Sequence, residues 1–222
     1  MAVNDEKYKE IVVELQQQKV TLVAVSKTKP NEDISDLYDL GQRDFGENYV
    51  QELVDKQVAL PKDIRWHYIG HLQSNKVKYI APFVHLIHGV DSFKLLKEIN
   101  KQAAKCGRVI DCLLQVHIAQ EETKFGMDEA ELKEVKNNSN DLANVRIGGL
   151  MGMASFSEDV EKVRGEFRYL KTLYDCFSPW TMAHGPWTVL SMGMSGDYKI
   201  AIEEGSTMVR IGSLLFGERE YD

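Results

Sequence analysis

Apolar runs and amphipathic stretches alternate along the whole chain. Residues 3–19 place Tyr8, Ile11 and Leu15 at helical spacing, which predicts a leading helix. Residues 20–27 then form an apolar run rich in Val, and the turn signal at Pro30 follows it. Such a run, closed by a proline, predicts a short strand that is buried on both faces.

The same alternation continues to the end of the chain. Seven more strand-like segments follow, near residues 43–46, 64–69, 84–88, 109–118, 145–151, 188–192 and 208–211. Helix-like segments separate them, near residues 31–40, 47–60, 72–80, 93–106, 128–138, 157–176 and 195–204, with Asn31, Ser92 and Ser195 as expected N-caps. Strict alternation of this kind favours parallel strands joined by helical crossovers. The pattern predicts an α/β fold: a single (β/α)8 TIM barrel domain over residues 1–222 with an extra N-terminal helix, and a doubly wound open sheet as the main alternative.

The composition limits what the chain can bind. Its 222 residues are 43% hydrophobic, enough for a sizeable core, and the formal net charge of -7 argues against a nucleic-acid or anionic-membrane surface. The first residues mix acidic and basic side chains, and no apolar run is long enough to span a bilayer. Three scattered cysteines without a CxxC spacing suit reduced thiols. We therefore expect a cytoplasmic protein with no nucleic-acid partner and no membrane partner.

A lysine at the end of the first predicted strand is the leading candidate for chemistry. Lys27 closes the apolar run 20–27, on the strand face that it shares with Val25. Functional groups of (β/α)8 barrels lie at the carboxyl ends of the strands. Burial there lowers the pKa of a lysine, and the neutral amine forms Schiff bases with aldehydes. A solvent-exposed Lys27 is the plain alternative, and Lys29 competes for the role, although it precedes Pro30 and is biased towards an extended loop.

Two loops near the end of the sequence have the composition of a phosphate site. The loop after the seventh predicted strand carries Ser191, Met194 and Ser195 among glycines, and the loop after the eighth carries Gly212 and Ser213. Glycines let the backbone approach an anion, and serines add hydroxyl and N–H donors. Phosphate sites of such barrels form from these two loops, although Gly-Ser loops are also ordinary turn material. A dinucleotide site is not indicated, because no GxGxxG follows the first strand.

An aldehyde-reactive lysine and a phosphate cradle together point to a ligand with an aldehyde and a phosphate, as in pyridoxal 5′-phosphate (PLP). Five segments also carry a family resemblance: AVSKTKP (24–30), FGENYVQE (45–52), HYIGHLQSNK (67–76), GLMGMASF (149–156) and LSMGMSGDYKIAIEEGSTMVRIGSLLFG (190–217). In order and spacing these segments resemble the YggS/PROSC family of pyridoxal-phosphate homeostasis proteins.

The resemblance implies a fold, a cofactor and a site. The fold is a barrel similar to the N-terminal domain of alanine racemase, and the cofactor is pyridoxal 5′-phosphate, held covalently as a Schiff base by Lys27 of the VSK motif. Arg210 of VRIG would lie beside the pyridine nitrogen and Asn48 of GENY near the ring, with His67 and Ile69 as pocket walls. The phosphate would be held by the loops that contain Ser191, Met194, Ser195, Gly212 and Ser213.

The resemblance also implies a role. Members of the family are mostly described without an established catalytic activity, and they buffer or deliver the cofactor. We therefore expect a monomeric, non-catalytic protein of vitamin B6 homeostasis and amino-acid balance, without metal-binding residues and with PLP-dependent apo-enzymes as partners. Arg210 agrees with this role, because a guanidinium does not support the protonated pyridine that makes the ring a strong electron sink.

A PLP-dependent amino-acid racemase is the main alternative. Racemisation needs one base on each face of the substrate, and Lys27 can serve only one face. In alanine racemase the other base is a tyrosine from a C-terminal domain, and we expect that domain to be absent because the sequence ends at Asp222. Tyr49 or Tyr68 would have to replace that base.

A metal-dependent barrel hydrolase is a further alternative. His67 and His71 are four residues apart, and His85 and His88 are three apart, but the pairs do not share a helical face and carboxylates at ligand spacing are lacking. A class I aldolase would also use a barrel lysine, yet it would not need Arg210.

Overall fold

The structure, a computed structural model, describes residues 3–119, 125–179 and 186–217. Eight parallel strands close into a barrel, in which each strand pairs with its neighbour in sequence and β8 pairs with β1. The strands are β1 (Thr21–Val25), β2 (Asp44–Glu47), β3 (Arg65–Tyr68), β4 (Leu86–Val90), β5 (Ile110–Val116), β6 (Val145–Gly152), β7 (Val189–Met194) and β8 (Met208–Ile211). The predicted TIM barrel is confirmed, and the open sheet is wrong.

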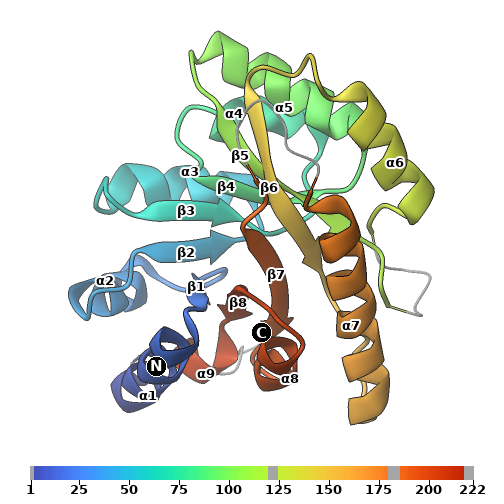
Figure 1. The fold of residues 1–222 in the computed structure, drawn as a ribbon. Coiled ribbons are helices and arrows are strands. Elements are labelled where there is room, and N and C mark those ends of the chain that lie inside the picture. Colours follow the sequence, from blue (N-terminus) through green and yellow to red (C-terminus); the bar gives the residue numbers. More distant parts are fainter. Residues whose placement is uncertain (1–2, 120–124, 180–185, 218–222) are drawn as a thin grey trace.

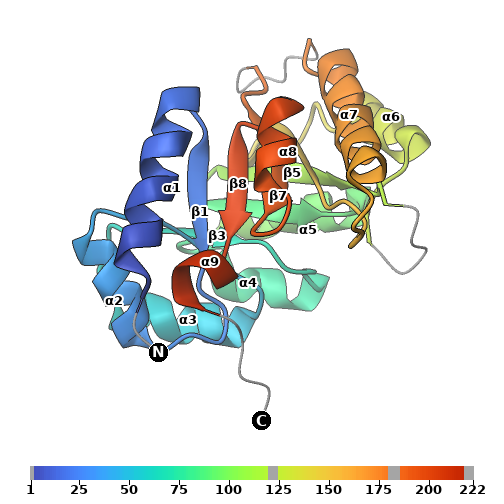
Figure 2. The same ribbon diagram turned by 90° about the horizontal axis from the view of Figure 1, so that it is seen from below.

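Helices surround the barrel (Figure 1). They are α1 (Asp5–Gln18), α2 (Asn31–Asp39), α3 (Val50–Ala59), α4 (Val77–Ile80), α5 (Phe93–Lys105), α6 (Glu129–Asn138), α7 (Val160–Phe177), α8 (Tyr198–Glu203) and α9 (Ser213–Phe216), with a 3₁₀ turn, η1 (Ser74–Lys76), before α4. The extra N-terminal helix α1 lies along β1 and reaches α9 (Figure 2), where the backbone N–H of Asn4 donates to the carbonyl of Leu215 at 2.9 Å. This contact brings the two ends of the described chain together.

Side chains of the strands alternate between the outside and the inside of the barrel, as the twofold periodicity of strands requires. In β8, Val209 and Ile211 belong to the large core between the strands and the helices, whereas Met208 belongs to a separate cluster within the barrel. The other members of this interior cluster are Val23, Leu86, Leu113 and Met151. Beside it, four polar side chains are buried from strands β3, β4, β7 and β8, namely His67, His88, Ser191 and Arg210. The interior is therefore apolar in one part and polar in another.

Element boundaries differ from the predictions at the site. Strand β1 ends at Val25, so Lys27 lies in the following loop and not at the last strand position. Ser92 is the N-cap of α5, where its Oγ accepts from the N–H of Leu95 at 3.3 Å. Asn31 and Ser195 are not N-caps, because α2 already begins at Asn31 and residues 195–197 form a turn before α8. The short helix α9 was not predicted, since four residues leave no readable periodicity.

Two features of the described residues relate to the composition. Cys106, Cys112 and Cys176 are free, and Cys112 alone is buried. No helix among the described residues has the length and apolar character that crossing a bilayer requires.

Candidate functional site

A cavity of about 630 Å³ opens at the carboxyl ends of the strands. This volume lies in the range of roughly 300–1,000 Å³ that is usual for small-molecule and cofactor sites. Eight of the predicted site residues line it: Lys27, Asn48, Ile69, Met194, Ser195, Arg210, Gly212 and Ser213. The loops after β1, β2, β3, β7 and β8 thus meet where the sequence predicts a site.

The loop that carries Lys27 is fixed on both sides of the lysine. Before it, the N–H of Ser26 donates to the carbonyl of Gly46 at 3.0 Å, and its Oγ donates to Oε1 of Glu47 at 2.6 Å. After it, Thr28 adopts φ +64° and its N–H donates to Oε1 of Glu52 at 2.6 Å. Lys27, half-buried, is held at the edge of the cavity by its two neighbours.

Glu47 and Glu52, which accept from Ser26 and Thr28, both contact a second, buried lysine that the sequence did not single out. Nζ of Lys56 donates to the carbonyl of Ser26 at 2.7 Å, to Glu47 Oε1 at 2.8 Å and to Glu52 Oε1 at 2.6 Å. Burial raises the pKa of Glu47, and the ion pair and hydrogen bond with Lys56 oppose that rise. The only signal in the sequence was a lysine among the acidic residues of α3, which is a common surface pattern.

The loops after β7 and β8 are joined into one cradle. Ser195 Oγ accepts from the N–H of Gly212 at 3.1 Å, and Gly193 turns the chain with φ +96° at a point where a Cβ would lie 2.6 Å from Cβ of Ala201. The backbone N–H groups of Ser195, Gly196 and Ser213 make no hydrogen bond within the described part, and all three residues line the cavity. A set of backbone donors of this kind suits an anion such as a phosphate.

A carboxylate also belongs to the cradle. Asp197 lines the cavity, and its Oδ1 accepts from the N–H of Met194 at 2.5 Å. That contact turns the carboxylate towards its own loop. The hydroxyl of Ser195 therefore links the two predicted phosphate loops to each other. The backbone N–H donors of these loops remain for a ligand.

Arg210 reaches the cavity from the barrel interior. It is 4% exposed, and Nη1 donates to the carbonyl and to Oγ of Ser191 at 2.9 and 2.6 Å, while Nη2 donates to the carbonyl of Gly152 at 3.0 Å. Burial lowers the pKa of Arg210 to about 10, with Asp197 acting in the opposite direction, so the guanidinium is charged at neutral pH. Three of its five N–H donors are used in the described part of the chain, which leaves two for a ligand.

Ser191 occupies a different place from the one expected. It is fully buried, it is not among the residues that line the cavity, and its hydroxyl is engaged by Arg210 and by His88 Nδ1 at 3.1 Å. The geometry favours a role behind Arg210 over contact with a phosphate. The reason is the length of β7. This strand continues to Met194, so Ser191 lies inside the strand and not in the loop after it.

Asn48 presents a buried polar atom to the cavity wall. Its Oδ1 is buried and has no hydrogen-bond partner in the described part of the chain. The backbone at this position is fixed, because the hydroxyl of Tyr68 donates to the carbonyl of Asn48 at 2.9 Å and burial raises the pKa of that phenol to about 12. An unmet buried polar atom beside a cavity indicates a site for a polar ligand.

The loop after β6 adds a wall that the sequence analysis did not assign. Residues 153–157 line the cavity, and Phe156 is 100% exposed. Buried Glu166 of α7 holds this loop, since it accepts from the N–H and the Oγ of Ser155 at 2.6 and 2.7 Å. The segment was part of the family resemblance, but nothing in its residue types pointed to a particular contact.

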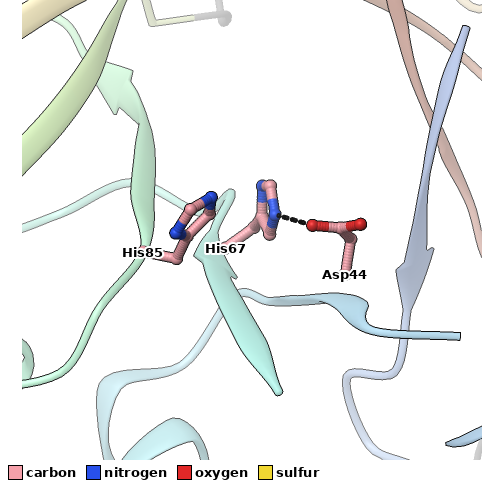
Figure 3. A group of neighbouring side chains, drawn as sticks. All are labelled: Asp44, His67 and His85. Carbon is pink, nitrogen blue, oxygen red and sulfur yellow. Dashed lines mark hydrogen bonds and ion pairs between the residues drawn. The ribbon is translucent and has the colours of Figure 1, made fainter. Parts of the chain in front are cut away.

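His67 lies away from the cavity, in a second group of side chains at the opposite end of the barrel. Figure 3 shows it between Asp44 and His85, and one possible ligand atom from each lies within 4.8 Å of the others. The expectation that no carboxylate accompanies the histidines is therefore wrong, because the pairing of β2 with β3 brings Asp44 beside His67. The carboxylate is already engaged: it accepts from Arg65 Nε at 2.7 Å and from His67 Nε2 at 3.0 Å. None of the three side chains of this group lines the cavity that Lys27 lines.

The chain matches a known protein family over nearly its whole length. The model of the alanine racemase N-terminal domain matches residues 5–220. A pyridoxal phosphate homeostasis protein of Aquifex aeolicus is 46% identical over 201 residues, which are 90% of this chain and 87% of that protein.

Solved structures agree with this match. PipY of Synechococcus elongatus PCC7942, with PLP bound, is 36% identical and superposes with a TM-score of 0.83 over 94% of this chain and 99% of that chain. Alanine racemase of Bartonella henselae, at 16% identity and a TM-score of 0.69, shares the fold over 96% of this chain and 59% of that chain.

Proposed function

The chain belongs to the alanine racemase N-terminal domain family, with pyridoxal phosphate homeostasis proteins among its relatives, and from this premise we propose that it binds pyridoxal 5′-phosphate in the cavity. Lys27 is the covalent anchor, residues 194–197 and 212–213 hold the phosphate, and Arg210 and Asn48 hold the ring. The protein stores and releases the cofactor for vitamin B6 homeostasis and amino-acid balance, without turning over a substrate.

One observation carries this proposal: a lysine, a set of backbone N–H donors and a buried arginine line the same cavity. An amine reacts with aldehydes, backbone N–H groups bind phosphates, and an arginine donates to the acceptor nitrogen of a heterocycle. Each group alone would fit many ligands. Their combination fits a phosphorylated aromatic aldehyde, and the unmet oxygen of Asn48 adds a place for a donor of the ligand.

The chemistry of the anchor is a condensation. The aldehyde of PLP supplies the carbonyl carbon with which Nζ of Lys27 forms a C=N bond, with release of one water. The contacts of Ser26 and Thr28 with Lys56 and Glu52 fix the backbone on both sides of Lys27. Storage needs only that this bond be reversible and that the phosphate be held.

Two features favour storage over racemisation. No tyrosine of the described residues lines the cavity: Tyr68 is 2% exposed and donates to backbone carbonyls, and Tyr49 is exposed outside the lining. The second base that racemisation requires is thus not supplied by either candidate. Arg210, charged and hydrogen-bonded, disfavours the protonated pyridine that carbanion chemistry uses.

We propose that the protein works as a monomer in the cytoplasm and passes PLP to apo-enzymes. The exposed free thiols of Cys106 and Cys176 suit a reducing compartment. Light scattering tests the monomer. Transfer is tested by mixing the loaded protein with a PLP-dependent apo-enzyme in the presence of a trap for free PLP, so that only direct hand-over restores activity.

The binding proposal is tested by reduction and mass spectrometry. Purified protein is mixed with PLP, reduced with borohydride and digested, and the modified peptide is expected to carry PLP on Lys27. Lys27→Ala should lose both the modification and the visible absorption band, Lys29→Ala should keep the modification on Lys27, and Lys133→Ala on the exposed face of α6 is the control. Modification of Lys29 in the wild type would reject Lys27 as the anchor. Amino-acid racemisation by the wild type, lost in Lys27→Ala, would favour the racemase.

A further inference from the structure

A row of polar side chains crosses the interior of the barrel from its N-terminal end to the cavity. Oδ1 of Asp44 lies 3.0 Å from Nε2 of His67, whose Nδ1 lies 2.9 Å from Nε2 of His88. Nδ1 of His88 lies 3.1 Å from Oγ of Ser191, which accepts from Nη1 of Arg210 at 2.6 Å. These five residues, the interior polar row, come from strands β2, β3, β4, β7 and β8.

The positions of the protons in the interior polar row follow from its two ends. Burial opposes ionisation of Asp44, but hydrogen bonds from Arg65 and His67 outweigh it and hold the pKa of Asp44 well below its usual value. The carboxylate can then only accept, so His67 carries a proton on Nε2. At the other end Arg210 can only donate, so Ser191 accepts from it.

The middle of the row must connect these ends. His88 is fully buried, and burial, with the positive charge of Arg210 acting in the same direction, holds its pKa well below the usual value. A neutral His88 has one N–H. If Nε2 bears it, His88 donates to Nδ1 of His67 and accepts the hydroxyl proton of Ser191, and every contact has one donor and one acceptor.

The opposite arrangement fails between the two imidazoles. With the proton of His88 on Nδ1, Oγ of Ser191 would accept from both His88 and Arg210, which its two lone pairs allow. Nε2 of His88 would then need a donor, and His67 could supply it only as a doubly protonated, buried imidazolium. The first arrangement keeps both imidazoles neutral and runs in one direction, from Arg210 to Asp44.

The direction matters because Arg210 is a buried cation whose three hydrogen bonds go to uncharged acceptors. A buried charge is costly unless it is compensated. In a chain of aligned hydrogen bonds each bond strengthens the next, by roughly 10–30%. The carboxylate of Asp44 thus makes the distant Oγ of Ser191 a better acceptor for Arg210.

We propose that Asp44, His67, His88 and Ser191 are positioning residues that fix the guanidinium of Arg210 towards the cavity. Arg210 would then keep an N–H donor for the ring nitrogen of the cofactor, a consequence that rests on the function proposed above. The orientation of the interior polar row itself does not depend on that function.

The row is tested first in ligand-free protein. Nitrogen-15 NMR of the imidazoles, assigned with single histidine variants, should show both His67 and His88 neutral, with hydrogen on Nε2 and none on Nδ1. Hydrogen on Nδ1 of either residue would reverse the row and overturn the proposal. This measurement needs no cofactor, so it holds or fails separately from PLP binding.

The second test uses PLP and 1-deazapyridoxal phosphate, an analogue in which a carbon replaces the ring nitrogen. His88→Leu interrupts the row and should lower the affinity for PLP about tenfold or more, as expected for the loss of one well-oriented, charge-assisted hydrogen bond. The affinity for the analogue should change by less than about threefold, because a ring without the nitrogen does not use this contact of Arg210. His88→Gln, which keeps a donor and an acceptor, should recover part of the loss.

Two results of the second test would overturn the proposal. An equal loss for PLP and for the analogue would mean that His88 matters only for folding or for the shape of the cavity. An equal, PLP-specific loss in His85→Leu would assign the effect to the group of Asp44, His67 and His85, because His85 lies beside the row without belonging to it.

Discussion

Nζ of Lys56 lies 2.8 Å from Oε1 of Glu47, and both side chains are buried beneath the loop that carries Lys27. Neither residue lines the cavity. The pair instead ties α3 to the end of β2, and through Ser26 it fixes the first turn after β1. The position of Lys27 thus depends on a second lysine that does not line the cavity.

Removal of one partner of this pair should be more harmful than removal of both. Lys56→Met leaves Glu47 buried without its cation, and breaking a buried ion pair in this way costs about 3–5 kcal/mol. The free energy of unfolding, measured in urea, should fall by that amount, and PLP should be released faster. The double variant Lys56→Met, Glu47→Gln should recover at least half of the loss. A double variant as unstable as the single one would contradict the role of the ion pair.

The stability of the protein should fall below pH 6.5 because of His88. Burial lowers its pKa in the folded protein, so below pH 6.5 the unfolded chain binds a proton that the folded protein does not. The free energy of unfolding should then decrease by up to about 1.4 kcal/mol per pH unit for this one group, until the pH reaches its folded pKa. Urea unfolding from pH 7 to pH 5 measures the slope. His88→Gln should flatten it.

The cradle should recognise the phosphate and not the rest of the ligand. Ser195→Ala removes the oxygen that accepts from the N–H of Gly212, so the two loops lose their link. The affinity for PLP should fall about three- to tenfold, the equivalent of one ordinary hydrogen bond. The affinity for pyridoxal, which lacks the phosphate, should be unchanged. Equal losses for both ligands, measured by fluorescence titration, would place the phosphate elsewhere.

Asn48 should lower the stability of the ligand-free protein and strengthen the binding of PLP. Its buried Oδ1 lacks a partner in the described part of the chain, and such a group costs roughly 1–3 kcal/mol. Asn48→Leu should therefore unfold at the same or a higher urea concentration than the wild type when no ligand is present. The same variant should bind PLP more weakly. A variant that is less stable and binds normally would show that the amide serves the fold and not the ligand.

Local patterns in the sequence predict much of this fold. The alternation of apolar runs and amphipathic helices predicts eight parallel strands, and the structure decides for the closed barrel over the open sheet. Lys27 could be singled out because the ends of such strands face one side of the barrel, Arg210 came from the family resemblance, and both residues do line one cavity. Strand limits follow less closely from the sequence: β7 extends two residues beyond the predicted end, to Met194, so Ser191 belongs to the strand and not to the loop after it.

What supports the site was decided only by the tertiary structure. Asp44, His67 and His88 are far apart in the sequence from Ser191 and Arg210, and they meet because barrel closure and strand register bring five strands to one line inside the barrel. Lys56 likewise looks like any lysine on an amphipathic helix until α3 packs beneath the loop of Lys27. Hydrophobic periodicity is a property of each segment alone, so the sequence determined the elements and the edge at which chemistry occurs. Partnerships between buried polar groups depend on how segments are aligned in space, and folding alone sets that alignment.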